Sequence, residues 1–430
     1  MLSPGLRAGR AGWRPCSPRS VRRVRNQVHG TSASTPRLAS VFTIAVFVAA
    51  APILVAIYAY VVYPAILWAL ANTGRRSIAA GERSDWPAIT ITVPVYNSVS
   101  SIRATLEGLL GLDYPKDRLQ LVVLSDASND GTDDIVREFA GQGVELCRAP
   151  VRRGKTAAEN AAVAIARGEI IVNVDATVLV PPASLKPLIR AFDDPTVRVA
   201  SGRDLSVGTG KGHQTAGESD YTNYEMLVRS LETRVGSIVG ASGCFYGIRR
   251  RIRIAPLPPA LSWDFASALV ARQQGYRSVS VDRATCVVPR TGEARLELDR
   301  KARTMARGLR TLFHFRALMN PLRYGGFALM LISHKLLRWV PYLLAPFAFL
   351  ALGVVATQSD VAAATLILVL LGLLAGAAGL VSRKPVFKPV AMTVFMVVAL
   401  SAGFLAWWDA IRGSRLVTWE PTPRPSASAG

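Results

Sequence analysis

Two long apolar blocks constrain this chain more than any other feature. Residues Leu38 to Ala71 contain no charged side chain, and a second block runs from Phe327 to Trp408. The first block is longer than the ~20 residues that a helix needs to cross the hydrocarbon of a bilayer. Half of the 430 residues are hydrophobic and they concentrate in these blocks, so part of that surface is expected to face lipid. The sequence therefore predicts membrane anchors on both sides of a globular domain.

The second block divides where polar residues interrupt it. Spans are predicted at roughly 339–356, 361–381 and 389–408, so that 339–409 holds about three transmembrane helices. Ahead of them, residues 322–338 carry Lys335 and Arg338 among apolar positions. This pattern is typical of an amphipathic helix that lies in the membrane interface.

The placement of basic residues predicts which side of the membrane the domain faces. The positive-inside rule places short loops rich in Lys and Arg in the cytoplasm. The link 382–388 is rich in them, whereas the link 358–360 has none. With one span in 38–71, the domain is then cytoplasmic, and the chain is an integral protein of an inner or plasma membrane with about four spans.

The first block and the tail before it leave alternatives open. Pro52 and Pro64 allow one kinked span or a short re-entrant pair. The tail 1–37 has several arginines and no acidic residue, although a single first span would place it outside. Either the block is a hairpin, or the tail is a targeting extension, or the start of the chain is misassigned. Both tails, 1–37 and 410–430, are expected to be disordered.

The net charge of +22 does not point to nucleic acid. The arginines are spread over the tail, the domain and the membrane flanks, and no basic stripe alternates with aromatic residues. Anionic membrane lipids account for such a charge. The four cysteines lack the short spacings of zinc and redox sites, so they are expected to be reduced thiols, as in a cytoplasmic domain.

Between the anchors, residues 87–312 alternate strand-like and helix-like patterns. The predicted strands are 88–93, 119–124, 144–147 and 169–174. Strands that alternate with helices form a parallel sheet, and ligands bind at the carboxyl ends of its strands. Tyr96, Asn97, Asp126 and Asp175 all follow strands. One shared binding edge is therefore predicted.

This edge carries several motifs in a fixed order between Ala88 and Leu312. They are Pro94-Val95-Tyr96-Asn97, Ser125-Asp126, Arg152-Arg153-Gly154-Lys155, Asp175-Ala176-Thr177, Gly240-Ala241-Ser242-Gly243-Cys244 and Ser262-Trp263-Asp264-Phe265. In this order they resemble the family-2 glycosyltransferases, in the membrane-embedded branch that includes hyaluronan and cellulose synthases. The resemblance implies an α/β domain of the GT-A type, which binds a nucleotide-sugar, flanked by transmembrane helices.

The same resemblance implies a donor site. Its donor-binding residues are Pro94, Tyr96, Asn97, Asp126, Lys155 and Asp175. Asp175 stands where the family has Asp-x-Asp, whose carboxylates bring Mg²⁺ or Mn²⁺ to the donor diphosphate. Thr177 replaces the second carboxylate, so metal binding rests on Asp175 and the diphosphate itself.

The acceptor side is implied by the later motifs. Gly243 and Cys244 lie in a loop of small residues that lines this side, and Asp264 is the implied base that takes the acceptor's proton. Trp263 replaces the family's first acidic residue and is assigned to acceptor binding by stacking on a sugar ring. Burial as an ordinary core tryptophan is the alternative.

One arginine is implied to stabilise the leaving group. Arg303 is what remains of the Gln-x-x-Arg-Trp motif of processive relatives, and its charge would balance the departing diphosphate. The alternative is a basic amphipathic helix that rests on lipid headgroups. Because Arg300 and Thr304 replace the Gln and the Trp, processive chain extension is in doubt.

The leading prediction is an inverting glycosyltransferase, of the hexosyl or N-acetylhexosaminyl type. It would move a sugar from a nucleotide-sugar donor to a polysaccharide or lipid-linked acceptor, in polysaccharide or cell-envelope synthesis, with a partner subunit for export left open. Two alternatives stay open: an enzyme that glycosylates a membrane lipid once, and a non-catalytic membrane scaffold that keeps the fold.

Overall fold

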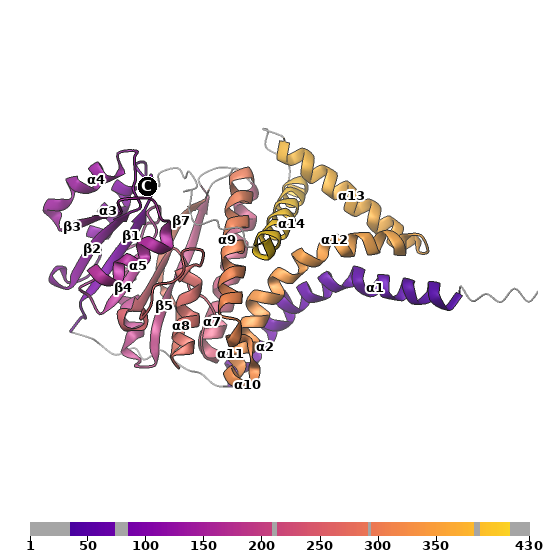
Figure 1. Cartoon of the computed structure of the whole chain (residues 1–430), viewed down its shortest axis with the longest axis horizontal. Helices are drawn as coiled ribbons and strands as arrows, with labels where there is room; N and C mark the ends of the chain where they lie inside the picture. Colours follow the sequence, from indigo (N-terminus) through magenta and orange to yellow (C-terminus); the bar gives the residue numbers. More distant parts are fainter. Residues whose placement is uncertain (1–34, 74–84, 209–212, 291–293, 382–387, 413–430) are drawn as a thin grey trace, which may run out of the picture.

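The computed structural model describes residues 35–73, 85–208, 213–290, 294–381 and 388–412. A sheet with helices on both faces occupies one half of the molecule, and long apolar helices extend from the other half (Figure 1). The arrangement matches the predicted order of anchor, domain and anchors.

The described chain contains one sheet of seven strands. The strands are β1 (Ile89–Val95), β2 (Leu119–Ser125), β3 (Val144–Arg148), β4 (Ile170–Val174), β5 (Val197–Gly208), β6 (Phe245–Arg249) and β7 (Arg277–Arg290). Their order is β3-β2-β1-β4-β6-β5-β7. β1 to β4 are parallel, whereas β6 is antiparallel to both of its neighbours. The four strands predicted from the sequence are present, each within two residues at either end.

Alternating β-branched residues explain β1, which lies in the middle of the sheet and is buried throughout. It pairs with β4 only over Ile89 to Thr92. Pro94, which has no N–H to donate, therefore lies beyond that ladder. The strand ends one residue later and the chain turns at Tyr96.

Helices cover both faces of the sheet (Figure 1). They are α3 (Ile102–Leu110), α4 (Thr132–Glu138), α5 (Lys155–Ile165), α6 (Leu185–Arg190), α7 (His213–Val235), α8 (Trp263–Gln273) and α9 (Ala294–His314). Apolar residues of α3 and α6 pack in one core with alternate residues of β1 and β2. On the opposite face, Val122 and Leu124 pack against Ala162 of α5. This leaves the carboxyl ends of β1, β2 and β4 at one edge.

The remaining helices are long and apolar. They are α1 (Thr35–Ile57), the π-helical turn η1 (Tyr58–Val62), α2 (Tyr63–Thr73), α10 (Pro321–Tyr324), α11 (Gly326–Leu331), the π-helical turn η8 (Ile332–Leu336), α12 (Leu337–Ala356), α13 (Asp360–Val381) and α14 (Lys388–Arg412). By length and composition, four helices of the described chain can cross a membrane: Ala39–Thr73, Gly326–Ala356, Asp360–Val381 and Pro389–Arg412. The number agrees with the prediction of about four spans.

The first span is one continuous helix, because α1, η1 and α2 follow one another without a break. The hairpin alternative is therefore wrong. Residues 35–37 and 410–412, predicted as disordered, are helical. The rest of both predicted tails lies outside the described residues.

The second span begins earlier than predicted. Gly326–Ala356 is a single helix of 31 residues, longer than a crossing requires. Lys335 and Arg338 lie in its first half and pair with Glu225 of α7, at 3.4 and 2.6 Å. They do not face lipid headgroups, as an interfacial helix over 322–338 would require, because α7 supplies a buried carboxylate.

Gly168 allows the chain before β4 to pass close to β1. A Cβ at this position would lie 2.4 Å from the carbonyl carbon of Ile89. Gly168→Ala is therefore expected to cost about 2 kcal/mol or more of stability through overpacking. Gly141→Ala is the matched control, since no heavy atom lies within 4 Å of its Cβ, and its effect should stay within about 0.5 kcal/mol. Thermal unfolding of the purified chain checks both, and equal melting temperatures would contradict the packing described.

Candidate active site

The loops after β1 and β2 are joined at the edge of the sheet. Asn97 has a left-handed φ of 48°, a conformation that asparagine tolerates better than most residues. Its Oδ1 accepts the N–H of Asn129 at 2.9 Å, and its own N–H donates to Ser128 Oγ at 3.2 Å. Beside it, the guanidinium of Arg152 lies 3.7 Å from the centre of the Tyr96 ring. Asn97 thus builds the edge, and Tyr96 and Arg152 form a cation–π pair on it.

Asp126 holds the basic loop that leads into α5. Its side chain is buried, with Oδ1 accepting the N–H of Arg153 and Oδ2 that of Gly154, each at 2.7 Å. Hydrogen bonds to an ionised acceptor are about twice as strong as neutral ones. The loop is therefore fixed to the end of β2, and the next residue, Lys155, starts α5 at a set position.

Lys155 lies at the centre of the site. Its Nζ is 2.5 Å from Asp175 Oδ1 and 3.4 Å from the carbonyl oxygen of Gly243. Burial lowers the pKa of this lysine, but the carboxylates of Asp175, Glu159 and Asp264 outweigh it and raise the pKa above its ordinary value. The ammonium therefore keeps its charge, and three carboxylates from separate elements surround it.

Asp264 lies in the first turn of α8. Its Oδ1 accepts the N–H of Phe265 at 2.7 Å and the hydroxyl of Ser262. Its Oδ2 faces Gly243, where a Cβ would lie only 2.7 Å away. Its carbonyl oxygen accepts the N–H of Ala241 at 3.0 Å. The carboxylate and the small-residue loop therefore fix one another, and glycine is required because no side chain fits.

The backbone of Cys244 joins the small-residue loop to Asp175. Its carbonyl accepts the N–H of Asp175 at 3.1 Å, and its N–H donates to Ser242 Oγ at 3.1 Å. Gly243 and Cys244 are both half-buried. Asp126, Asp175 and Asp264, which the sequence placed around one cleft, are thus linked through Lys155 and this loop.

Arg307 is a candidate residue that the sequence reasoning missed. It lies one turn after Arg303 on α9, and its guanidinium donates to Thr156 Oγ1 at 2.6 Å and to the carbonyl of Leu261 at 2.7 Å. Burial lowers its pKa, an effect that Asp264 and Glu159 oppose. Arg303 is half-buried and shares this face of α9, since residues four apart are neighbours on a helix. The four-residue spacing from Arg303 was therefore the sequence feature that could have identified Arg307.

Two predicted binding residues are turned away from the cleft. Trp263 is only 2% exposed, donates its indole N–H to Asn160 Oδ1 at 2.7 Å, and has the Arg253 guanidinium 4.5 Å from its ring centre. It cannot stack on a sugar in this conformation, so the alternative of a core tryptophan holds. Pro94 is buried within β1, and its predicted contact with a donor stays a prediction.

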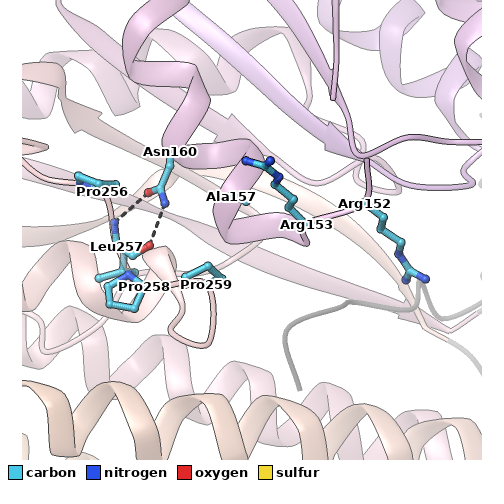
Figure 2. Close-up of a pocket in the computed structure, with 8 residues that line it drawn as sticks. All are labelled: Arg152, Arg153, Ala157, Asn160, Pro256, Leu257, Pro258 and Pro259. Atoms are coloured by element: carbon cyan, nitrogen blue, oxygen red, sulfur yellow. Dashed lines mark hydrogen bonds between the residues drawn. The ribbon is translucent and has the colours of Figure 1, made fainter. Parts of the chain in front are cut away.

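A groove of about 570 Å³ lies beside the basic loop. It is lined by Arg152, Arg153, Ala157, Asn160, Pro256, Leu257, Pro258 and Pro259. In Figure 2 the two arginines lie at one end and the prolines at the other. The side chain of Asn160 lies on the proline side and bonds the backbone of Leu257 twice, at 2.8 and 3.0 Å. The groove borders α5 at Ala157 and Asn160, and most of its lining is apolar.

Only one carboxylate of the predicted metal motif is present. Among the described residues, no group of three or more His, Cys, Asp and Glu side chains can hold a metal ion. Lys155 contacts Oδ1 of Asp175, so Oδ2 is the oxygen through which Asp175 would bind a cation. A hard oxygen ligand fits Mg²⁺ or Mn²⁺, provided that waters and phosphates complete the shell.

The arrangement combines two kinds of charge around Lys155. Lys155 and Arg307 offer cations to an anionic ligand such as a diphosphate, and the carboxylate of Asp264 can accept a proton. Glu159, on the next turn of α5, is fully buried, and burial raises its pKa. A site of this composition suits group transfer from a phosphorylated donor.

The fold is of the GT-A type. A mannosyltransferase from Pyrobaculum calidifontis superposes with a TM-score of 0.68 at 23% identity, over 87% of this chain and all of that one. Residues 90–253 match the family model Glycosyl transferase family 2. This part of the chain is therefore a glycosyl transferase family 2 domain.

Curated relatives match parts of the same region. A hyaluronan synthase of Streptococcus pyogenes is 25% identical over 39% of this chain and 42% of its own length. An undecaprenyl-phosphate 4-deoxy-4-formamido-L-arabinose transferase of Aeromonas hydrophila is 24% identical over 39% of this chain and 50% of its own length. Matches to the first curated relatives span between 23% and 50% of those proteins.

The bonds of Asp126 predict how the basic loop responds to mutation. In Asp126→Asn an amide N–H₂ would face a backbone N–H, so one of the two 2.7 Å bonds is lost and the loop loosens. Trypsin is expected to cleave after the exposed Arg153 about tenfold faster, the change that ~1.4 kcal/mol of local stability produces. Asp134→Asn, an exposed carboxylate paired with Arg137, is the control. Equal cleavage rates would show that Asp126 does not hold the loop.

Proposed function

We propose that the protein is an integral membrane glycosyltransferase. It moves a sugar, with inversion, from a nucleotide-sugar donor to a polysaccharide or lipid-linked acceptor. The observation that carries the proposal is the placement of Lys155 between Asp175 and the carbonyl of Gly243, with Asp264 facing that same glycine. A diphosphate and an acceptor hydroxyl would meet at this point, within a family 2 domain.

Asp264 is the proposed catalytic base. Inversion needs one carboxylate that takes the acceptor's proton while the acceptor oxygen attacks the anomeric carbon opposite the leaving diphosphate. Oδ1 is already bound by Ser262 and Phe265, so Oδ2, beside Gly243, is the oxygen that accepts the proton.

Cations are proposed to stabilise the leaving group. Negative charge grows on the diphosphate as the glycosidic bond breaks, and preorganised donors in a buried site stabilise it strongly. Lys155 and Arg307 are held by hydrogen bonds on either side of Thr156, and Arg303 is one turn away. Tyr96, Asn97 and Asp126 form the edge proposed to receive the nucleotide.

A divalent cation is proposed at Asp175. The Pyrobaculum mannosyltransferase was solved with GDP-Man and Mn²⁺, and the single carboxylate here fits a cation shared with the donor. When bound, it neutralises charge on the diphosphate. Asp175 would hold it through Oδ2.

The acceptor is proposed to be held at the membrane. The names of the two relatives refer to hyaluronan and to undecaprenyl phosphate, a polymer and a lipid. In this chain α9, which carries Arg307, packs along the last span α14, so an acceptor anchored in the bilayer could reach the cleft. Arg300 and Thr304 depart from the processive motif, which favours short products. The basic link 382–388 favours a cytoplasmic domain.

Replacing the proposed base tests this mechanism. Asp264→Asn should lower the turnover of transfer by about 100-fold or more, because the acceptor proton has no receiver. Nucleotide binding should persist. Asp113→Asn, an exposed carboxylate paired with Lys186, should keep full activity. The measurement is nucleotide release and labelled product from UDP- and GDP-sugars with membranes, which also separates a polymer from a single lipid. Unchanged transfer in Asp264→Asn would exclude this base, and no turnover by the natural chain would favour a scaffold.

Removal of divalent ions tests the proposed cation. EDTA is expected to abolish transfer, and added Mg²⁺ or Mn²⁺ to restore it, since the charges of Lys155 and Asp175 cancel one another and leave the diphosphate charge largely unbalanced. Nucleotide binding measured with and without the metal gives a second readout. Full activity in EDTA would show that no metal ion is needed and that Lys155, Arg303 and Arg307 balance the charge of the diphosphate.

A further inference from the structure

A buried cluster of charged side chains connects the first and second membrane spans to α7 of the domain. Three of its members, Glu225, Arg229 and Glu232, occupy one face of α7, where residues four and seven apart align. They face Tyr63 on α2 and, in the second span, His334, Lys335 and Arg338. All of these side chains are buried or nearly so. The cluster lies outside the donor site.

Glu232 connects both spans to the loop of residues 239–243, here called the glycine loop. Its side chain has 0% exposure. It accepts the hydroxyl of Tyr63 at 2.6 Å, the Nδ1–H of His334 at 2.6 Å and the N–H of Val239 at 3.4 Å. One carboxylate therefore receives a bond from the first span, the second span and the start of the glycine loop.

His334 bridges the two glutamates. Its Nδ1 lies 2.6 Å from Glu232 and its Nε2 lies 3.0 Å from Glu225. The two ring nitrogens therefore face one glutamate each. Arg338 adds a 2.6 Å bond to Glu225 and Arg229 a 3.3 Å contact. Burial raises the pKa of Glu225, but the neighbouring His334, Lys335 and Arg338 hold it well below its ordinary value.

The cluster reaches the glycine loop at two further points. A Cβ on Gly240 would lie 3.5 Å from Cε of Lys335. The Lys335 ammonium also lies 5.7 Å from the centre of the Phe265 ring, and Phe265 directly follows Asp264. Arg229 approaches Ser201 Oγ at 3.5 Å, and that oxygen accepts the N–H of Ser242 at 2.8 Å. The loop that presses against Asp264 is thus held from Val239 to Ser242.

Apolar packing alone would suffice to attach the spans. Apolar residues of α2, α7, α8, α9 and α11 already form one continuous core beside the cluster. Buried ion pairs often stabilise a fold less than well-packed apolar residues of the same volume, because desolvation is costly. What directional bonds add is fixed geometry. In this cluster, the hydrogen bonds of Glu232 and Arg229 lead to the glycine loop at Val239 and, through Ser201, at Ser242.

We propose that this cluster positions the glycine loop, and through it the Asp264 carboxylate, so that the membrane spans form part of the catalytic support. Tyr63, Glu232 and Lys335 are its positioning residues. The inference rests on the proposed function, since it concerns the base of that reaction. It predicts that weakening the cluster lowers turnover and leaves the donor site intact.

A pair of matched tyrosines tests the proposal. Tyr63→Phe removes a buried hydroxyl that donates to Glu232 at 2.6 Å. Tyr114→Phe removes an equally buried hydroxyl that donates to the carbonyl of Pro87 at 2.6 Å, far from the glycine loop in the fold. The full chain is reconstituted in lipid nanodiscs, and kcat, donor KM, nucleotide binding and melting temperature are measured. Both melting temperatures are expected to fall, that of Tyr63→Phe by more, because its lost bond is to a carboxylate and that of Tyr114→Phe is to a neutral carbonyl.

Turnover should separate the two variants. Tyr63→Phe is expected to lower kcat about tenfold, the change that ~1.4 kcal/mol produces, with donor KM and nucleotide binding unchanged. Tyr114→Phe should keep the kcat of the natural chain. Lys335→Met, which keeps the stem beside Gly240 and removes the ammonium, should act like Tyr63→Phe and replaces it if that variant does not fold.

Three outcomes would overturn the proposal. They are an unchanged kcat in Tyr63→Phe and Lys335→Met, a fall in nucleotide binding that parallels the fall in kcat, and an equal loss of kcat in Tyr114→Phe. Failure of the proposed function is a separate result, since the natural chain would then turn over no nucleotide-sugar and the variants could not be ranked. Nucleotide binding by the natural chain still distinguishes a scaffold from an inactive preparation.

Discussion

The carboxyl ends of β1, β2 and β4 meet at one edge of the sheet, and the site depends on this constraint. Parallel strands supply the edge, but they do not hold the loops that carry charge. Asp126 does so with two 2.7 Å bonds to the backbone of the basic loop. Lys155 is therefore held at a fixed position, within contact distance of Asp175 and the carbonyl of Gly243. Asp126, at the end of β2, thus sets the position of the Lys155 ammonium.

Two separate sets of buried charges differ in their position and in their exposure to solvent. The set around Lys155 contains carboxylates from α5, α8 and the end of β4, and its net effect is to keep an ammonium charged in a partly buried cleft. The set around Glu225 lies between α7 and the second span and pairs its charges with one another. The first set is half-open and suited to a ligand, whereas the second is closed. Buried charges without partners would destabilise either region by several kcal/mol.

Local sequence signals predicted the sheet and most of the edge. Short apolar segments, the first of them a β-branched run, located the first four strands, and polar residues after them located Asn97, Asp126 and Asp175, because these signals act within a few residues. Features that depend on contacts with residues far away in the chain could not be predicted from the sequence. Lys335 and Arg338 resembled an interfacial helix until Glu225, more than a hundred residues earlier, was placed beside them. Trp263 resembled a sugar platform, but Asn160 and Arg253 enclose it. Arg303 and Arg307 share one helical face, and only the fold shows which of them reaches Thr156.

Trp339 explains how the spans and the cleft keep their spacing. A Cβ on Gly308 of α9 would lie 2.8 Å from its ring, so α9 and the second span touch closely one residue after Arg307. The same ring meets Phe265 edge-on at 6.3 Å, one residue after Asp264. A shift of the second span would therefore move the arginine side and the base side of the cleft together. Because packed interiors transmit displacement instead of absorbing it, these contacts couple the position of the second span to those of Arg307 and Asp264.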